Sequence, residues 1–196
     1  MVLDLESRPG DAAQRLAEAA RNRRHAMHTP VIGTSDGDLR IMVLREAHAD
    51  LACLRFHTDL RSPKAVLIGQ GAAVSVLAYD PVERVQLRMK GTGRIEHEGP
   101  VADAAWACAA ASSRRCYLAE AGPGAELGRP GSALPEALLD RAPLLEETLP
   151  GRAHFAVLLV EVLSLDWLRL THRGGERARF ARSHAAAPWE GAWVAP

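Results

Sequence analysis

The sequence predicts an α+β protein built on an antiparallel β-barrel. Runs of apolar residues, some of them alternating with polar ones, recur along the chain and are separated by turn residues, as strands joined in hairpins require. Ala-rich segments within 1–28 and at 101–122 predict helices that flank these strands. No repeat or linker divides the sequence, so we expect a single domain over residues 1–196.

The N-terminal part predicts one helix followed by short strands. Residues 11–27 are rich in Ala, Leu, Glu and Arg and contain no Pro or Gly, which indicates a helix. Pro30 marks its end, because the residue before a proline avoids the helical region. Asp36-Gly37 is a favoured hairpin turn. The strands expected on either side of this turn and after it are 30–35, 39–46 and 49–59.

Two long strands are predicted in the middle of the chain. Residues 72–80 are apolar on both faces, which favours a central strand, and residues 83–99 alternate clearly. In the alternating strand, Val85, Leu87 and Met89 share one face, and Gln86, Arg88 and Lys90 share the other. After the helix at 101–122, the sequence predicts a Pro- and Gly-rich loop at 122–135, a weak helix at 135–149 and strands within 153–196.

Composition excludes several classes of function. Lys plus Arg equals Asp plus Glu at 24 each, which argues against a general nucleic-acid binder. Three widely spaced cysteines indicate reduced thiols, and neither a signal peptide nor a stretch of about 20 apolar residues is present. We therefore expect a soluble, cytoplasmic protein that does not bind a membrane. The eight histidines show no metal-ligand spacing, and phosphate-loop and dinucleotide motifs are absent from the sequence.

Residues 56–64, FHTDLRSPK, carry the strongest functional signal. A strand ends near Thr58, and a short helix follows with Ser62 as its N-cap and Pro63 in its first turn. Unsatisfied backbone N–H groups, a hydroxyl and the cations Arg61 and Lys64 would suit a phosphate monoester. The alternative is a capped helix with solvated charges.

Three further patterns have both a functional and an ordinary interpretation. Arg40 and Arg45 bracket an apolar run, and strict alternation puts them on opposite faces unless a bulge intervenes. The polar face of strand 83–99 either meets solvent or lines a site. Tryptophans near arginines in the C-terminal part could hold a flat ring and its phosphate, or form a buried strand with a basic tail.

The order of these motifs resembles the pyridoxamine 5′-phosphate oxidase family. RIMVLR, FHTDLRSPK, VQLRMKG, a helix, DWLRL with RARF, and a final W with VAP occur in that order over roughly residues 15–196. The sequence looks closest to an FMN-binding branch with a TD-x-RS-x-K signature. The resemblance implies a split β-barrel and a homodimer that binds two FMN molecules at the subunit interface.

The resemblance also implies cofactor contacts, residue by residue. His57 and Thr58 would contact the flavin ring and ribityl chain, Ser62 and Lys64 its phosphate, and Arg61 would replace the charge that the family carries at Pro63. Gln86 would reach the isoalloxazine from the second subunit. The other implied FMN contacts are Arg40, Met42, Val43, Trp167 and Arg177.

The sequence departs from the oxidase itself in its substrate contacts. Tyr117 is followed by alanines where the oxidase has Arg and Ser, and Arg45 stands where the oxidase has a lysine. The late R-L-H motif is replaced by Arg173 and two glycines. Losing several charged contacts, each worth about 1.5–3 kcal/mol, argues against pyridoxal 5′-phosphate production. Arg45, Tyr117 and Arg173 stay weak candidates for substrate contacts.

Two functions stay open at this point. One is an FMN-dependent oxidoreductase with a small-molecule substrate and no assigned acid or base. The other is a non-catalytic FMN carrier, or a split barrel that holds haem or a deazaflavin. Turnover of a reductant or an amine with O₂ would separate the enzyme from the carrier.

Overall fold

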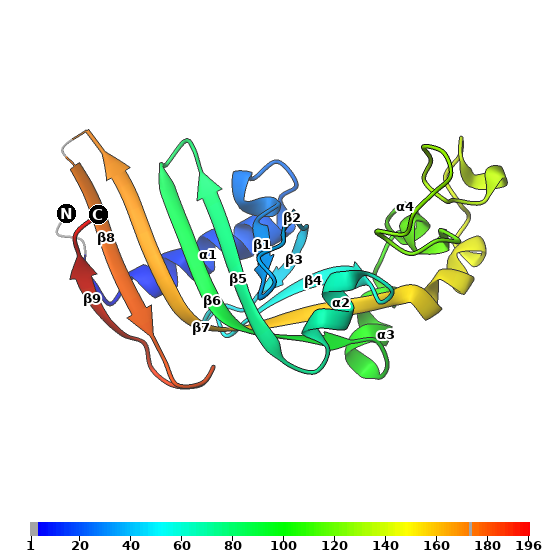
Figure 1. Ribbon diagram of the computed structural model, residues 1–196. Helices are drawn as coiled ribbons and strands as arrows, with labels where there is room; N and C mark the ends of the chain where they lie inside the picture. The colour runs from blue at the N-terminus through cyan, green and yellow to red at the C-terminus, as the bar shows by residue number, and fades with distance from the viewer. Residues whose placement is uncertain (1–3, 173) are drawn as a thin grey trace. The chain divides into compact units, whose positions relative to one another are not determined.

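A computed structural model describes residues 4–172 and 174–196 and has the predicted α+β split-barrel fold (Figure 1). Neighbouring strands of its sheet follow the order β2-β1-β5-β6-β7-β4-β3, and β8 and β9 continue from β7. The strands are β1 (Val31–Thr34), β2 (Leu39–Ile41), β3 (Leu44–Ala47), β4 (Cys53–Asp59), β5 (Ala72–Asp80), β6 (Val85–Glu96), β7 (Phe155–Thr171), β8 (Gly174–Ala181) and β9 (Glu190–Val194).

Helical segments precede and connect the strands. The α-helices are α1 (Arg8–Arg21), α2 (Pro63–Ile68), α3 (Pro100–Ala107) and α4 (Ala111–Arg114). The 3₁₀ segments are η1 (Ala26–His28), η2 (Arg115–Leu118), η3 (Glu136–Leu138) and η4 (Glu146–His154). Within the described chain, no helix has the length and apolar character needed to cross a membrane.

The chain forms two compact units, each built from separate segments. Unit 1 comprises Met1–Phe56, Gln70–Arg94 and Leu159–Pro196. Unit 2 comprises His57–Gly69 and Ile95–Leu158. Because strands β4, β6 and β7 each contribute to both units, neither unit is a continuous stretch of sequence.

Unit 1 is a sheet with one buried face and helix α1 packed against it (Figure 1). The alternation predicted for β6 is confirmed, since Val85, Leu87 and Met89 are buried while Arg88 and Lys90 are exposed. Strand β5 also alternates, and it is a central strand as predicted because it lies between β1 and β6. The apolar side chains of its second face, Leu77 and Tyr79, are exposed.

Gly91 marks a close approach of two backbones in unit 1. A Cβ atom built on Gly91 would lie 1.7 Å from the carbonyl oxygen of Glu161 on β7. Real Cβ atoms never come so close to another atom, so strands β6 and β7 can pack here only because this residue has no side chain.

Unit 2 has an aromatic centre. The rings of Trp106 and Tyr117 each lie within 5.2 Å of the ring of Phe155, measured between centroids, and His57 lies edge-on to it at 4.9 Å. These tilted and T-shaped contacts are the geometry that aromatic pairs prefer. Phe155 is fully buried and is the shared partner of the group.

The helix predicted at 101–122 is wrong in length, and a buried arginine explains why. Arg114 is 4% exposed and donates hydrogen bonds to the carbonyl oxygens of Trp106 and Ala107, at the end of α3. Its guanidinium also covers the Trp106 ring. The chain must fold back after Ala107 to make these contacts, so α3 ends there and α4 starts anew.

Other predicted elements differ at their edges. The N-terminal helix runs from Arg8 to Arg21 instead of 11–27, and the weak helix at 135–149 is replaced by the 3₁₀ segments η3 and η4. The Asp36-Gly37 hairpin is confirmed between β1 and β2, with Gly37 at φ +83°. The strands predicted within 153–196 are confirmed as β7, β8 and β9.

Candidate functional site

The predicted cofactor residues are distributed over both units. Those in unit 2 are His57, Thr58, Arg61, Ser62 and Lys64, and those in unit 1 are Arg40, Met42, Val43, Gln86, Trp167 and Arg177. Of the weaker candidates, Arg45 lies in unit 1 and Tyr117 in unit 2, while Arg173 lies outside the described residues.

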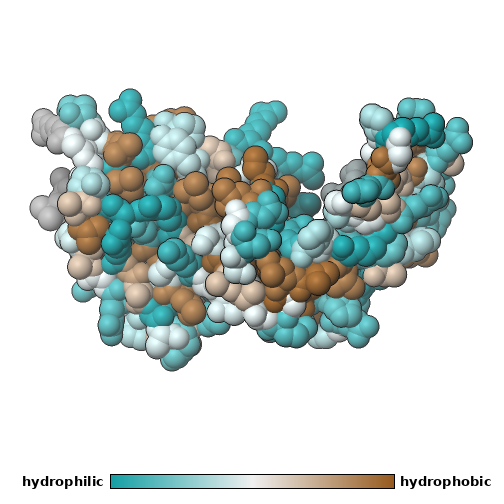
Figure 2. Space-filling view, in the orientation of Figure 1, coloured by the Kyte–Doolittle hydropathy of each residue, from teal (hydrophilic) through white to brown (hydrophobic). Residues whose placement is uncertain are grey.

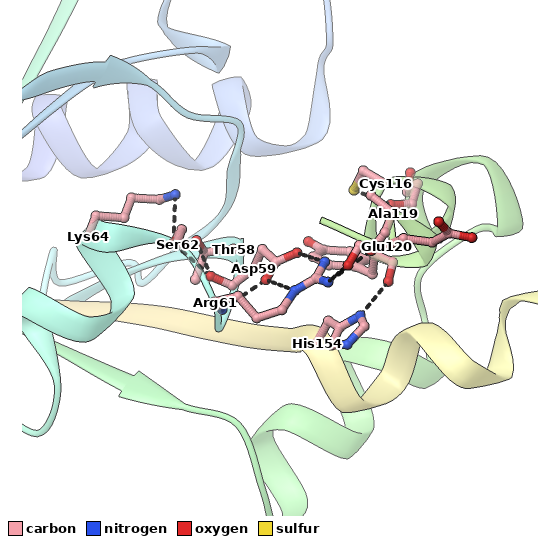
Figure 3. Close-up of polar contacts among 11 residues, drawn as sticks. Thr58, Asp59, Arg61, Ser62, Lys64, Cys116, Ala119, Glu120 and His154 are labelled. Carbon is pink, nitrogen blue, oxygen red and sulfur yellow. Dashed lines mark hydrogen bonds and ion pairs between the residues drawn. The ribbon is translucent and has the colours of Figure 1, made fainter. Parts of the chain in front are cut away.

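The turn between β4 and α2 brings Thr58, Ser62 and Lys64 together (Figure 3). Lys64 donates from Nζ to the hydroxyl of Ser62 at 3.2 Å, and the hydroxyls of Thr58 and Ser62 are 3.4 Å apart. Thr58 and Ser62 are buried, and Lys64 is half-buried. Two hydroxyls and an ammonium group at this spacing form a cluster that can hold an anionic oxygen.

The backbone around this cluster offers fewer donors than the sequence predicted. Ser62 is the N-cap of α2, but its own N–H is bonded to the Asp59 carbonyl, and its hydroxyl donates to the same carbonyl. Pro63 has no N–H, and the Ala65 N–H is bonded to the Ser62 carbonyl. A phosphate bound here would therefore depend on side chains more than on the helix N-terminus.

Arg61 does not join the Ser62–Lys64 cluster. Its Nε and Nη2 donate to the two carboxylate oxygens of Asp59 at 3.0 and 2.7 Å, and its Nη1 donates to the Ala119 carbonyl at 2.8 Å. In Figure 3 its guanidinium points toward Ala119, away from Lys64. Arg61 thus ties the turn to the loop at 119–120. Its expected role as a replacement phosphate ligand stays a prediction, and it would require the guanidinium to leave these contacts.

Two other candidates in unit 2 belong to the aromatic centre. His57 is half-buried, with its ring edge against Phe155. Tyr117 is buried between Trp106 and Phe155, and its carbonyl oxygen contacts the His154 ring at 2.8 Å. Both side chains therefore pack against Phe155, which is distant in the sequence, so the local motifs could not predict this role.

In unit 1, the arginines around the predicted RIMVL motif lie beside a strand break. Strand β2 ends at Ile41 and β3 begins at Leu44, and the pairing of β3 with β4 shifts between Leu44 and Glu46. Arg45 is the extra residue at this bulge, which is the irregularity that a shared role for Arg40 and Arg45 requires.

The residues of this motif differ in how accessible they are. Arg40 donates to the Thr34 hydroxyl at 2.8 Å and pairs with Asp38, so its guanidinium is already held in place. Met42 is buried and donates its N–H to the Pro30 carbonyl, and Val43 is half-buried.

Trp167 is 1% exposed and lies beneath α1. Its indole N–H donates to Asp11 at 2.8 Å, and the Arg8 guanidinium covers its ring. Both Asp11 and Arg8 belong to the first turns of α1. A flavin could stack on Trp167 only if this helix moved aside.

The outer face of unit 1 carries an arginine cluster around Asp166, which we call the Asp166 cluster: Asp166 with Arg88, Lys90, Arg177 and Arg179. The Asp166 carboxylate accepts from Arg88 at 2.7 Å, from Arg177 at 2.8 and 3.0 Å, and from Arg179 at 3.0 Å. Burial favours the neutral acid, but the hydrogen bonds from Arg177 and Arg179 outweigh it and lower the pKa of Asp166.

A pocket of about 350 Å³ opens beside this carboxylate. Its lining residues are Arg88, Lys90, Ser164, Leu165, Asp166, Arg179 and Phe180. The sequence pointed to the polar face of β6 and to the late arginines separately. It did not identify Asp166, because only the pairing of β7 with β8 places Arg179 directly opposite it.

Gln86 lies on the same outer face and is half-buried. It pairs with Tyr79 of β5, so an amide and an exposed aromatic ring are neighbours there. Among the residues that the structure describes, no group of three or more His, Cys, Asp or Glu side chains could hold a metal ion.

Comparison with known proteins agrees with this architecture. The chain superposes on an FMN-binding protein related to pyridoxamine 5′-phosphate oxidase from Nostoc punctiforme PCC 73102 with a TM-score of 0.71 and 23% identity, covering 100% of this chain and 99% of that one. The chain has the fold of these split barrels. PhzG from Burkholderia lata 383, in complex with tetrahydrophenazine-1-carboxylic acid, gives 0.68 at 17% identity over 98% and 95%.

A third structure is more distant. A protein related to general stress protein 26, of the pyridoxinephosphate oxidase family from Clostridium acetobutylicum, gives a TM-score of 0.51 at 12% identity, over 89% of this chain and 95% of that one. No protein-family model and no curated protein matches the chain. The fold expected from the resemblance is therefore confirmed by structure rather than by sequence similarity.

Proposed function

We propose that this chain is an FMN-binding flavoprotein whose phosphate site is the cluster of Thr58, Ser62 and Lys64. The observation that carries the proposal is the convergence of two hydroxyls and one ammonium group on a single turn. It is supported by the motif order of the sequence and by the Nostoc punctiforme structure of the same fold, which is an FMN-binding protein.

The side chains of this turn fit a phosphate monoester. Lys64 supplies a positive charge, and the Thr58 hydroxyl can turn to donate. The Ser62 hydroxyl accepts from Lys64 and so positions the ammonium group. The Ser62 hydroxyl donates to the Asp59 carbonyl oxygen at 2.7 Å, and the Asp59 carboxylate accepts a hydrogen bond from Arg61. Arg61 therefore supports the turn as a positioning residue, while Lys64 provides the charge that would meet the phosphate.

The outer face of unit 1 supports a homodimer, which we include in the proposal. Leu39 and Ile41 of β2 and Leu77 and Tyr79 of β5 are large apolar side chains exposed on this face. Figure 2 shows hydrophobic surface where Figure 1 places β1, β2 and β5, and more hydrophilic surface where it places β7 and β8. An exposed apolar area with a polar border is typical of a protein–protein interface.

In such a dimer, Gln86 of one subunit would contact the isoalloxazine held by the other. Its amide can both donate and accept, which suits the edge of a flavin ring. Arg177 is held by Asp166 through two hydrogen bonds, so its guanidinium has a fixed orientation. A fixed cation near the ring would favour the reduced anion.

We further propose that the protein is an oxidoreductase acting on a small molecule. Bound FMN would supply hydride or electron transfer, and the protein residues would bind and orient the cofactor. Arg40, held by Thr34 and Asp38, is the unit 1 cation that the resemblance assigns to FMN.

Flavin titration tests the proposal directly. Wild type should bind FMN in a saturable way and should bind riboflavin more weakly, because riboflavin lacks the phosphate. Alanine at both Arg40 and Lys64 should remove most of this preference. Equal affinity for FMN in wild type and in the double variant would disprove the phosphate site. Light scattering that shows a flavin-loaded monomer would disprove the dimeric arrangement.

A further inference from the structure

The Asp166 cluster holds more positive charge than its structural role requires. Three guanidiniums surround one carboxylate, and Lys90 lines the same pocket, so the cluster carries an excess of three positive charges. A single bidentate arginine neutralises the charge of a carboxylate, and Arg177 already makes that contact. Arg88, Lys90 and Arg179 therefore need another explanation, since like charges placed close together raise each other's energy.

Asp166 orients the arginines of the cluster but accepts hydrogen bonds from only some of their N–H groups. Within residues 4–172 and 174–196, the hydrogen bonds found for Arg179 involve only its Nε, and those for Arg88 only one terminal nitrogen. The Arg179 side chain is 60% exposed, whereas the Asp166 carboxylate is 16% exposed. Asp166 thus holds one nitrogen of each of the two guanidiniums and leaves their remaining N–H groups for an acceptor that comes from solvent.

The pocket has the size and the lining for a small anion. Its volume of about 350 Å³ lies at the lower end of the range for ligand sites, roughly 300–1,000 Å³. Besides the cations it offers the Ser164 residue and the apolar Leu165 and Phe180. Asp166 is the one acidic residue among those that line it, and its carboxylate is occupied by arginines.

We propose that this pocket binds the phosphate or carboxylate groups of a small organic anion, at a site separate from the FMN phosphate site. Arginine is suited to this task because its planar fork of N–H donors matches both kinds of oxyanion. Two arginines held by a common carboxylate form a receptor that is oriented before the ligand arrives, which lowers the entropy cost of binding. The inference does not depend on flavin binding, because none of the residues that line the pocket is assigned to FMN.

The test uses inorganic phosphate and citrate as probes, in calorimetric titrations of apo and FMN-loaded protein at constant ionic strength set with chloride. Wild type should bind at least one of the two probes saturably in both forms. The double variant Lys90→Gln and Arg179→Gln should bind the same probe about tenfold more weakly or worse, as expected for the loss of charge-assisted hydrogen bonds. Its FMN affinity should change less than twofold.

A matched control separates the pocket from general charge effects. Arg23 is an exposed arginine beyond the end of α1, and Arg23→Gln combined with Arg24→Gln removes the same two charges. The control should bind the probes as wild type does. Equal weakening in both double variants would show simple attraction by net charge and would overturn the proposal.

Two other results would also overturn it. If loading with FMN abolishes binding of the probes, the pocket belongs to the flavin phosphate and is not a separate site. If wild type binds neither phosphate nor citrate, the cluster is structural. Failure of the FMN proposal would instead appear as absence of flavin binding with anion binding intact, so the two outcomes can be told apart.

Discussion

Asp59 and Asp166 are both largely buried carboxylates that accept hydrogen bonds from arginine, yet the two regions are built differently. Asp59 in unit 2 binds Arg61 one to one, and the remaining Arg61 nitrogen reaches a backbone carbonyl. Asp166 in unit 1 is shared by three arginines. In the first arrangement one carboxylate balances one guanidinium, and the pair fixes a loop. In the second, three guanidiniums share one carboxylate, so net positive charge and several N–H donors remain. The number of cations per carboxylate thus separates a structural pair from a candidate binding site.

The largest expected effect comes from breaking the one-to-one pair. Asp59→Ala should lower the free energy of unfolding by about 3 kcal/mol, because it leaves a partly buried guanidinium without its carboxylate and frees the turn. Urea unfolding at pH 7 measures this. Asp103→Ala is the control in the same unit, since Asp103 pairs with Arg152 but is 65% exposed, and it should cost under about 1 kcal/mol. Similar losses in both variants would contradict the structural role of Asp59.

The next effect distinguishes the two cations of the unit 2 turn. Lys64→Ala should weaken FMN binding by about 2 kcal/mol, roughly 30-fold, and leave riboflavin binding unchanged, because only FMN has the phosphate. Arg61→Ala should lower stability and weaken FMN and riboflavin to similar extents, since Arg61 positions the turn. Fluorescence titration of both flavins measures this. A selective loss of FMN in Arg61→Ala would return Arg61 to the phosphate site.

A pH-dependent effect is expected at Asp166. Because its pKa is lowered in the folded protein, its stabilisation is complete above the unfolded value of about 3.9 and is lost as the pH falls through the lower folded value. Asp166→Asn should therefore cost about 1–2 kcal/mol at pH 7, and this gap to wild type should narrow as the pH falls below about 3.9. Chemical denaturation across that pH range measures it. A gap that stays constant with pH would contradict the ionised cluster.

The smallest effect is expected at the surface pair of Arg141 and Glu147. The hydrogen bond from Arg141 is the main reason that the pKa of Glu147 is lowered to about 2. Solvent screens this pair, so Glu147→Gln should leave the melting temperature within about 1–2 °C of wild type despite the large pKa shift. Thermal unfolding by circular dichroism measures this. A larger drop would show that pairing geometry matters more than burial at this pair.

Local patterns predicted the strands better than the sites. The alternation of Val85, Leu87 and Met89 predicted the buried face of β6, because side-chain direction follows from the sequence spacing alone. The break after Ala107 could not be predicted, since it depends on Arg114 reaching back to α3. The Asp166 cluster was missed for a similar reason, because it unites residues of β6, β7 and β8 through strand register.

The motif at 57–64 shows both the reach and the limit of sequence reasoning. Thr58, Ser62 and Lys64 are close in sequence, and the structure brings them together as expected. Asp59 is only two residues from Arg61 in the sequence, so this ion pair could have been predicted. It was missed because the phosphate-binding interpretation assigned both cations of the motif to the phosphate. The contact of Arg61 with Ala119 joins distant segments and requires the fold.

The contact between Gly91 and Glu161 has a spectroscopic consequence. One α-hydrogen of Gly91 points where a Cβ would be, and therefore points at the Glu161 carbonyl oxygen. Such Cα–H···O contacts occur between adjacent strands. The two α-protons of this glycine should therefore differ strongly in chemical shift. Selective glycine labelling would make this residue a reporter of whether β6 and β7 stay in register when flavin or an anion binds.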